Sequence, residues 1–159
     1  MPKLSRLPFV EEPETRHPVL GVPMHAYAHC ILGDPGGLTQ FGVHIERLPP
    51  GSTSSLRHWH ETEDEFILML SGEVILREEG GETRLAAGDA AAWPAGVPNG
   101  HCLENRSGAD AIYLTVGTRN RADVIHYPDH DCICHKDGSA RRWTRGDGTA
   151  VAADTPSDP

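Results

Sequence analysis

The sequence predicts an all-β fold in one domain, on three observations. The 159-residue chain contains 17 glycines and 13 prolines, which divide it into short apolar segments, a composition typical of strands joined by tight turns. Runs of helix-favouring residues are scarce. The apolar segments recur at the short spacing of a sandwich or barrel. Because a chain of this length buries roughly two-thirds of the surface that its unfolded form exposes, a folded core is expected without disulfides.

The charge balance limits the expected partners. The formal net charge is −9 at pH 7, whereas nucleic acids and anionic membranes are bound through clustered Lys and Arg. No segment approaches the ~20 apolar residues of a membrane span, and the first residues lack the apolar stretch of a secretory signal. We therefore expect a cytoplasmic protein that binds no nucleic acid and no membrane, with reduced cysteines.

The first strands follow an N-terminal arm. Residues 1–23 hold five prolines among mixed charges, which predicts an irregular path. Residues 24–32 and 39–48 each predict a strand. The intervening GDPGG carries the Gly and Pro that a chain reversal needs, so these two strands are expected to form a hairpin.

The next strands follow the apolar segments between turn residues. One strand is predicted over 55–60, and two more over 65–78 on either side of Gly72. In REEGGETRL, two glycines at the centre of polar residues predict a further hairpin. The remaining strands of the barrel are expected to end near Trp93, to begin near His101, and to cover 109–117.

The C-terminal part of the chain predicts one more hairpin. CICHKDGSARRWT can reverse around Asp137 and Gly138, and the small polar residues that follow predict a flexible tail. We expect eight to ten strands and no helix. The expected organisation is an N-terminal arm (1–23), a barrel (24–127), and a C-terminal hairpin with a flexible tail (128–159).

The first candidate metal ligands are histidine and glutamate residues that precede the FILML segment. Side chains alternate across a strand, so His58 and His60 point to the same face and can converge on one ion. Glu65 can return on the neighbouring strand, and a carboxylate beside two imidazoles suits a divalent transition metal. His101 begins a strand after a loop rich in Gly and Pro and is the natural fourth ligand. The acidic run leaves three alternatives to Glu65, namely Glu61, Glu63 and Asp64.

Two motifs in the right order resemble those of the cupin superfamily. The first reads GxxxxxHxH followed by ExxxxxxG, and this chain has Gly51, His58, His60, Glu65 and Gly72 in that order, with one extra residue before His58. The second reads GxxxxxPxGxxHxxxN. This chain matches it with Gly88, Pro94, Gly96, His101 and Asn105, and has two extra residues before His101. Asn99 stands where a rigid count would place the histidine, but His101 keeps the usual distance to Asn105.

The resemblance covers residues 51–105 by motif, and roughly 25–118 with the flanking strands; it is to small single-domain bacterial cupins. It implies a small antiparallel barrel of the double-stranded β-helix type, similar to a jelly roll and commonly a homodimer. The apolar residues on both faces of FILML also favour a dimer. The resemblance further implies one divalent transition metal ion, such as Fe, Mn, Zn or Ni, held by four ligands: His58, His60, Glu65 and His101.

A metal cage with open positions is typical of catalysis. We expect an enzyme of isomerase, lyase or Fe-dependent dioxygenase type that acts on a small oxygen-rich molecule, such as a sugar or keto acid. Glu65 and His44 are the candidates to move a proton. His44 shares a strand face with Gly42 and Glu46, although an ordinary polar position is an equal alternative. A function of another class stays open: a non-catalytic cupin that senses or binds a ligand together with a partner protein.

The segment HYPDHDCICH gathers five potential ligands near the C-terminus. A second metal site is one interpretation, but structural zinc sites favour CxxC-type pairs, which are missing here. Buried thiols in a strand are the preferred interpretation. The residues concerned are His126, His130, Cys132, Cys134 and His135.

Overall fold

The computed structural model describes residue 3 and residues 7–151. The first residues of the predicted arm and residues 152–159 of the predicted flexible tail lie outside the described residues. Within the described part of the chain, no helix is long and apolar enough to cross a membrane.

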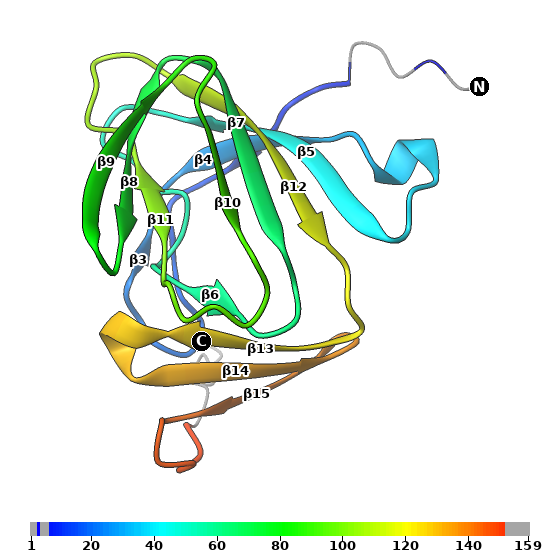
Figure 1. Cartoon of the computed structure of the whole chain (residues 1–159), viewed down its shortest axis with the longest axis vertical. Coiled ribbons are helices and arrows are strands. Elements are labelled where there is room, and N and C mark those ends of the chain that lie inside the picture. The colour runs from blue at the N-terminus through cyan, green and yellow to red at the C-terminus, as the bar shows by residue number, and fades with distance from the viewer. Residues whose placement is uncertain (1–2, 4–6, 152–159) are drawn as a thin grey trace, which may run out of the picture.

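The regular secondary structure of the described residues consists of strands and two short 3-10 helices, which confirms the all-β prediction (Figure 1). In chain order the elements are β1 (Val10–Glu12), β2 (Thr15–Arg16), β3 (Pro23–Met24), β4 (Tyr27–Ile31), the 3-10 helix η1 (Asp34–Gly36), β5 (Phe41–Leu48), β6 (Trp59–His60), β7 (Glu65–Ser71), β8 (Glu73–Glu78), β9 (Gly81–Ala86), β10 (Ala90–Trp93), β11 (Cys102–Glu104), β12 (Ala111–Thr118), β13 (Ala122–Tyr127), the 3-10 helix η2 (Pro128–His130), β14 (Cys132–Asp137) and β15 (Ala140–Thr144). There are more strands than the eight to ten expected, because several very short segments also pair.

Two antiparallel sheets form the barrel. The larger has the order β1-β4-β5-β12-β7-β10, and the smaller has the order β11-β8-β9. The predicted hairpins β4–β5 and β8–β9 are both present. Alternation sends one set of side chains from each sheet inward, where they meet in a single core. The buried members of that core are Leu48, Ile67, Met69, Val74, Leu76, Leu85, Trp93, Leu103, Ala111 and Tyr113.

A third sheet crosses the lower end of the barrel in Figure 1, with the order β15-β14-β13-β6. The predicted C-terminal hairpin is β14–β15, with Asp137 paired to Ala140. This sheet continues through β13 to β6, where Ile125 pairs with His60. The C-terminal hairpin is therefore continuous with the segment that carries the HxH motif.

Two residues of the motifs, Gly72 and Asn105, fix the backbone conformation around the start of β12. Gly72 has a φ of +73°, and a Cβ there would lie 2.5 Å from the carbonyl oxygen of Asp110, so no larger side chain fits. Asn105 is 1% exposed. Its Nδ2 donates to the carbonyl oxygens of Leu48 (2.7 Å) and Ala109 (2.8 Å). The second motif therefore fixes the turn before β12 as well as supplying a histidine.

The N-terminal arm is tied to the rest of the fold. β1 pairs with β4, which extends the large sheet into the segment expected to be irregular. His17 is 8% exposed and packs edge-on against Tyr127 and Trp143, at ring-centroid distances of 5.8 and 5.0 Å. The arm and the C-terminal hairpin thus share one aromatic cluster.

The buried His17 predicts a pH-dependent stability. Its Nδ1 accepts hydrogen bonds from the backbone N–H groups of Val19 (3.3 Å) and Leu20 (3.1 Å). Burial, and next the charge of His130, lower the pKa of His17 below its ordinary 6.5. Below about pH 6.5, His17 is therefore protonated more readily in the unfolded chain than in the folded chain. The free energy of unfolding is expected to decrease as the pH falls through this range.

Urea denaturation between pH 7.5 and 5 measures this effect. His17→Asn keeps an acceptor for the two N–H groups and removes the titration, so its stability is expected to vary less with pH. Equal pH dependence in the wild type and in His17→Asn would contradict the prediction.

Candidate metal centre

Three chain segments bring the predicted ligands to one end of the barrel. His60 lies on β6, and the preceding His58 pairs with His101 in an isolated antiparallel bridge. Glu65 is the first residue of β7. The loop of 61–64 is short, so the carboxylate returns beside the two imidazoles.

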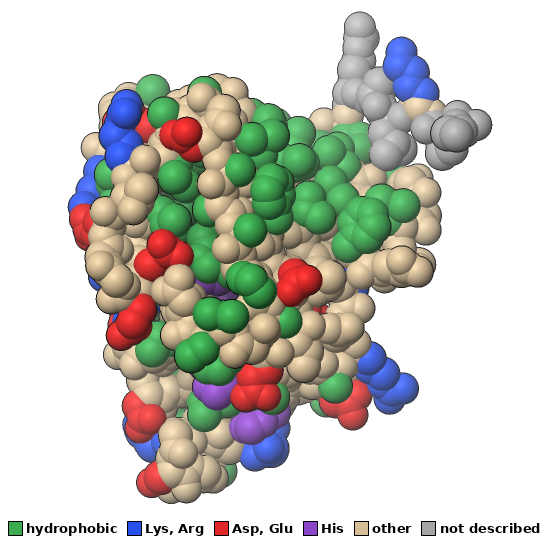
Figure 2. All heavy atoms as spheres, in the orientation of Figure 1, with side chains coloured by type: hydrophobic (Ala, Val, Ile, Leu, Met, Phe, Trp, Pro, Cys, Tyr) green, Lys and Arg blue, Asp and Glu red, His purple; other side chains and the backbone are tan. Residues whose placement is uncertain are grey.

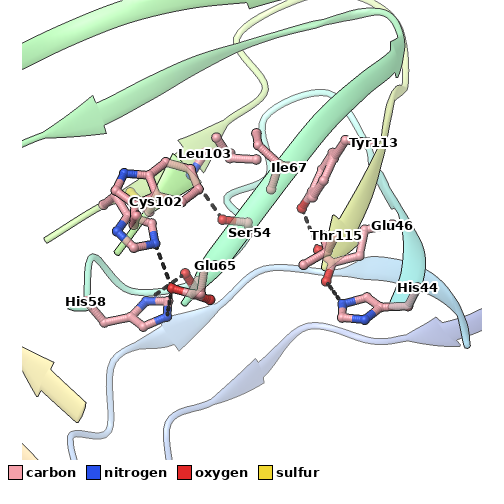
Figure 3. A pocket seen from close by; sticks show the side chains of 13 residues that line it. His44, Glu46, Ser54, His58, Glu65, Ile67, Cys102, Leu103, Tyr113 and Thr115 are labelled. Carbon is pink, nitrogen blue, oxygen red and sulfur yellow. Dashed lines mark hydrogen bonds and ion pairs between the residues drawn. The ribbon is translucent and has the colours of Figure 1, made fainter. Parts of the chain in front are cut away.

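All three imidazoles approach one carboxylate oxygen (Figure 3 shows Glu65 and His58). The Nε2 atoms of His101, His60 and His58 lie 2.9, 3.7 and 4.0 Å from Oε2 of Glu65. The ligand atoms of His58, His60 and Glu65 all lie within 4.8 Å of one another. The fold therefore brings together the four residues that the motifs indicated.

Each of the three imidazoles has an acceptor at its other nitrogen. Nδ1 of His58 lies 2.8 Å from the carbonyl oxygen of Leu56, and Nδ1 of His101 lies 3.2 Å from that of Asn99. Nδ1 of His60 lies 2.5 Å from Oδ2 of Asp123. Since a neutral imidazole has a single N–H, a metal ion that took the three Nε2 lone pairs would leave the Nδ1–H groups to be donated to these acceptors.

The donor set fits a divalent transition metal. Three Nε2 lone pairs and an anionic oxygen would repel one another across these distances unless a proton or a cation lay between them. Imidazole and carboxylate ligands suit Fe, Mn, Zn and Ni, and histidine ligands in metal sites commonly donate their other N–H to a carboxylate or carbonyl. The described residues show this arrangement for all three histidines.

Aromatic rings hold two of the imidazoles in place. Trp93 stacks on His101 at a centroid distance of 3.8 Å and an interplanar angle of 7°. Tyr127 stacks on His58 at 5.9 Å. These contacts limit rotation of the rings and shield one side of the cluster from water.

The electrostatics of the cluster favour a neutral His58 and an ionised Glu65. Burial lowers the pKa of His58 to about 4, although the charge of Glu65 opposes this shift. Burial by itself would raise the pKa of Glu65, but the hydrogen bond with His101 and the charges of the three histidines lower it to about 2. At neutral pH His58 is therefore neutral and Glu65 is ionised, the forms in which these two groups bind a metal ion.

The cluster opens into a cavity of about 240 Å³ inside the barrel. On the wall away from the cluster, β5 and β12 direct His44, Glu46, Tyr113 and Thr115 inward (Figure 3). Nε2 of His44 lies 2.8 Å from Oε1 of Glu46, and the hydroxyl of Tyr113 donates to Oε2 of the same carboxylate. His44 thus lines the cavity, as its strand position suggested, and its partner Glu46 was not singled out in the sequence.

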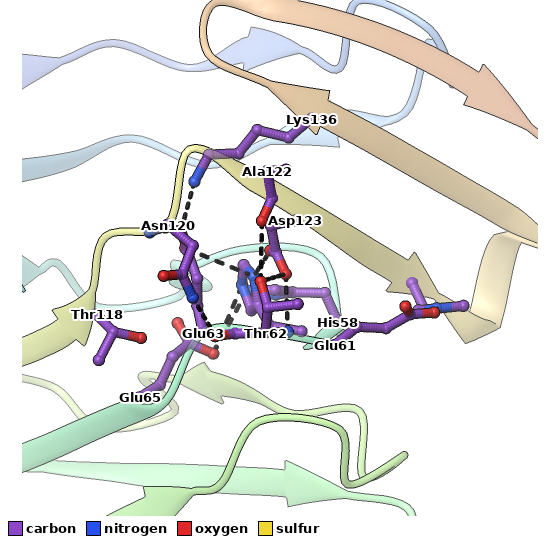
Figure 4. A network of polar contacts seen from close by, with 12 residues as sticks. His58, Glu61, Thr62, Glu63, Glu65, Thr118, Asn120, Ala122, Asp123 and Lys136 are labelled. Atoms are coloured by element: carbon purple, nitrogen blue, oxygen red, sulfur yellow. Dashed lines mark hydrogen bonds and ion pairs between the residues drawn. The ribbon is translucent and has the colours of Figure 1, made fainter.

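Asp123 is the principal site residue that sequence reasoning missed. Its side chain is fully buried, and besides His60 it accepts hydrogen bonds from the backbone N–H and the hydroxyl of Thr62, at 3.0 and 2.8 Å (Figure 4). Asp123 lies on β13, and nothing in its local sequence distinguishes it from a surface aspartate. Only the pairing of β13 with β6 brings it to His60.

The three alternatives to Glu65 have other partners. Glu61 lies 2.8 Å from Nε2 of His126, and Asp64 accepts a hydrogen bond from the backbone N–H of Ala95 at 2.7 Å. Glu63 forms an ion pair with Lys136. His60, Glu63 and Asp123 also form a group whose ligand atoms lie close together, but the ammonium group of Lys136 already supplies a positive charge to Glu63.

Asn99 lies outside the cluster. Its side-chain Nδ2 donates to Oε1 of Glu78 at 2.8 Å, and its Oδ1 accepts from the backbone N–H of Glu79 at 3.1 Å. Only its carbonyl oxygen faces a ligand histidine, at Nδ1 of His101. Asn99 therefore anchors the loop before His101 to β8.

The five C-terminal candidates disperse in the described part of the chain. Cys132 and Cys134 are free and buried in β14, while His126 stacks on Trp59 and His135 contacts the hydroxyl of Thr144. His130 is the last residue of η2. Burial raises the pKa of both thiols. The cysteines are buried, uncharged thiols, as the preferred interpretation had it.

Comparisons with known proteins agree with this architecture. The family model for the cupin domain matches residues 44–117. The chain is 41% identical to a crystal structure from Silicibacter pomeroyi, named as a sugar phosphate isomerase from a cupin superfamily, over 97% of this chain and 99% of that one, with a TM-score of 0.85. A structure from Acidithiobacillus ferrooxidans shares 26% identity over 80% of this chain and 81% of that one, with a TM-score of 0.75.

A curated relative matches a shorter region. The oxalate-binding protein of Thermotoga maritima is 36% identical over 70 residues, which is 44% of this chain and 55% of that protein. The match thus spans about half the length of that relative.

Proposed function

The chain belongs to the cupin superfamily, and from this membership we propose that it is a metal-dependent enzyme acting on a small oxygen-rich metabolite such as a sugar or keto acid. The proposed ligands of a single divalent ion are His58, His60, Glu65 and His101. One observation carries the proposal: three oriented Nε2 atoms approach one carboxylate oxygen at the edge of a cavity. A site that opens into a cavity is typical of catalysis rather than of structural metal binding.

The bound ion would polarise a carbonyl or hydroxyl oxygen of the substrate as a Lewis acid. Of the two proton carriers proposed from the sequence, His44 is the better placed, because Glu65 is engaged with the three histidines. Glu46 accepts the Nε2–H of His44, which orients the ring toward the cavity that it lines. We assign His44 the transfer of a proton to or from the substrate.

The relatives support the choice of reaction class. The Silicibacter pomeroyi protein is named as a sugar phosphate isomerase, and the Thermotoga maritima relative as oxalate-binding. Both names describe small molecules rich in oxygen. An isomerase moves a proton between neighbouring atoms of such a molecule, which needs one polarising group and one proton carrier. Lyase and Fe-dependent dioxygenase chemistry remain within the same proposal.

Turnover by metal-loaded protein tests the proposed function. Purified protein is loaded separately with Fe, Mn, Zn and Ni and incubated with a panel of sugars, hydroxy acids and keto acids, and products are followed by NMR. The proposal expects turnover by wild type and a loss of at least tenfold in His44→Gln with metal content unchanged. A ligand-induced rise in melting temperature without product would favour the binding or sensing function instead.

We also propose that the protein is a homodimer. β5, β12 and β7 present contiguous apolar side chains on the outer face of the large sheet, and Figure 2 shows hydrophobic side chains gathered over these strands. Among them, Phe41, Phe66 and Leu70 are 38%, 37% and 44% exposed. A sheet that is apolar on both faces is typical of one covered by another layer, and a second copy of this chain would cover it.

The dimer proposal makes a prediction for Phe66 and Leu70. Wild type is expected to have twice the 17.3 kDa mass of the chain in light scattering, whereas Phe66→Lys combined with Leu70→Lys is expected to have the mass of one chain, because two buried ammonium groups would destabilise the interface. Val97, 47% exposed in a loop, provides the control Val97→Lys, which should remain dimeric. A monomeric wild type would contradict the proposal.

The free, buried state of all four cysteines supports the further proposal of a cytoplasmic location. Disulfides are rare in reducing compartments.

A further inference from the structure

The cavity wall away from the metal cluster carries four polar side chains from two neighbouring strands. Glu46 on β5 and Tyr113 on β12 are cross-strand partners, as are His44 and Thr115. The register of one strand pair therefore places all four side chains on the same inner surface. Figure 3 shows this surface across the cavity from His58 and Glu65.

The carboxylate of Glu46 has two hydrogen-bonding partners on this wall of the cavity. Burial, and then the charge of Glu46, raise the pKa of Tyr113 well above its ordinary value, so the phenol stays protonated and donates to Oε2 of Glu46. His44 contacts Oε1. Each contact uses one lone pair of the carboxylate, which has about four acceptor sites. The remaining sites can accept from donors in the cavity.

Thr115 gives a second, independent observation. Its Oγ1 is buried and has no hydrogen-bond partner among the described residues, although buried hydroxyl groups are usually paired. Thr115 lines the same cavity as Glu46. A hydroxyl group of a bound ligand would supply the missing partner.

The charges of the cavity select against a phosphate ester. Two carboxylates, Glu46 and Glu65, line it, and no Lys or Arg of the described residues does. The neighbouring cavity, which shares Ser54 and Ser55 with it, adds the carboxylate of Glu12. A divalent ion bound by Glu65 leaves one positive charge at the cluster, which Glu46 balances. A phosphate dianion would leave the cavity with two uncompensated negative charges, whereas neutral hydroxyl groups can donate to Glu46.

From this juxtaposition we infer that Glu46, Tyr113 and Thr115 form a subsite for the hydroxyl groups of an uncharged polyhydroxy compound, so that the ligand is a free sugar or polyol and not its phosphate. The inference rests on the proposed function and narrows its substrate class. It separates this chain from the Silicibacter pomeroyi relative, which is named as a sugar phosphate isomerase.

Matched pairs of ligands test the inference. Metal-loaded protein is titrated calorimetrically with D-ribose, D-xylose and D-fructose, and with the terminal phosphate ester of each. We expect at least one free sugar to bind at least tenfold more tightly than its ester, and no ester to bind more tightly than its sugar. Tighter binding of any ester, or no binding of any free sugar, would overturn the inference.

Two variants assign the effect to the subsite. Glu46→Gln keeps the shape and removes the charge, and Thr115→Val removes the hydroxyl; each is expected to weaken binding of the free sugar about tenfold. Glu46→Gln should also reduce the difference in affinity between the free sugar and its phosphate ester. The control is Glu73→Gln, which removes an exposed carboxylate paired with Arg84 and should change neither affinity. Unchanged sugar affinity in both subsite variants would contradict the assignment.

Metal content, measured on the same samples, separates this inference from the proposed function. If the protein retains one ion per chain but binds the phosphate ester more tightly than the free sugar, only the inference of an uncharged ligand is refuted. Samples of wild type that bind no metal refute the proposed function itself.

Discussion

Replacing His58 and His101 together by alanine is expected to abolish metal binding. The two residues pair across an antiparallel bridge, and their Nε2 atoms lie 4.0 and 2.9 Å from the carboxylate oxygen of Glu65. With both removed, one imidazole and one carboxylate remain, too few ligands for tight binding in a site of this type. Inductively coupled plasma mass spectrometry of the purified variant is expected to show less than a tenth of the wild-type metal content.

The control for this variant removes a histidine that lies outside the cluster. His126 stacks on Trp59 outside the cluster, so His126→Ala is expected to retain metal. Circular dichroism should show that the double variant is still folded, since the barrel core does not depend on the ligands. Wild-type metal content in a folded double variant would refute the assignment of the site.

Replacing Asp123 by asparagine is expected to weaken metal affinity by about 10- to 100-fold, the range typical of groups that orient a ligand histidine. The carboxylate accepts Nδ1–H of His60 at 2.5 Å and is held in turn by Thr62. An amide is a weaker acceptor and can turn its NH₂ group toward Nδ1, which would favour the wrong tautomer. The effect acts through His60, so Asp123 is a positioning residue and not a ligand.

Competition with a chelator of known affinity measures the change. Asp137→Asn is the matched control, because Asp137 pairs with Arg121 at the exposed end of β14 and should leave affinity unchanged. The ¹⁵N chemical shifts of His60 provide a readout that general loss of stability would not reproduce: in the metal-free wild type they should report the Nδ1–H tautomer, and in Asp123→Asn a mixture. Wild-type affinity in Asp123→Asn would show that Asp123 serves only the fold.

Two of the four ligand candidates could be paired from the sequence because strand geometry is local, whereas Glu65 and His101 were selected with the help of the motif spacing. Alternation of side chains puts His58 and His60 on one face, whatever the rest of the chain does. The hairpins β4–β5 and β8–β9 were predictable for the same reason, since Gly and Pro between apolar segments set the reversals. For His44, the strand pattern left an inward position and an ordinary polar position as equal alternatives, and its contact with Glu46 was not foreseen.

The supporting residues could not be found in this way, because their role depends on strands that are distant in the chain. Asp123 and His60 are 63 residues apart, and Tyr113 and Glu46 are 67 apart. No local pattern marks either pair. The same holds for the contact of His17 with Trp143, which joins two segments expected to be separate arms.

By itself, then, the sequence determined the class of fold, the turns and the shared face of His58 and His60, since backbone preference and period-two alternation act over a few residues. The resemblance to the cupin motifs completed the set of four candidate ligands. The tertiary structure alone decided which strands became neighbours. The pairing of distant strands brought the buried Asp123 to His60, placed Glu46 and Thr115 on the inner wall, and left apolar side chains on the outside of the large sheet. The sequence could not decide these features, because strand pairing and barrel closure depend on the packing of the whole chain rather than on any one segment.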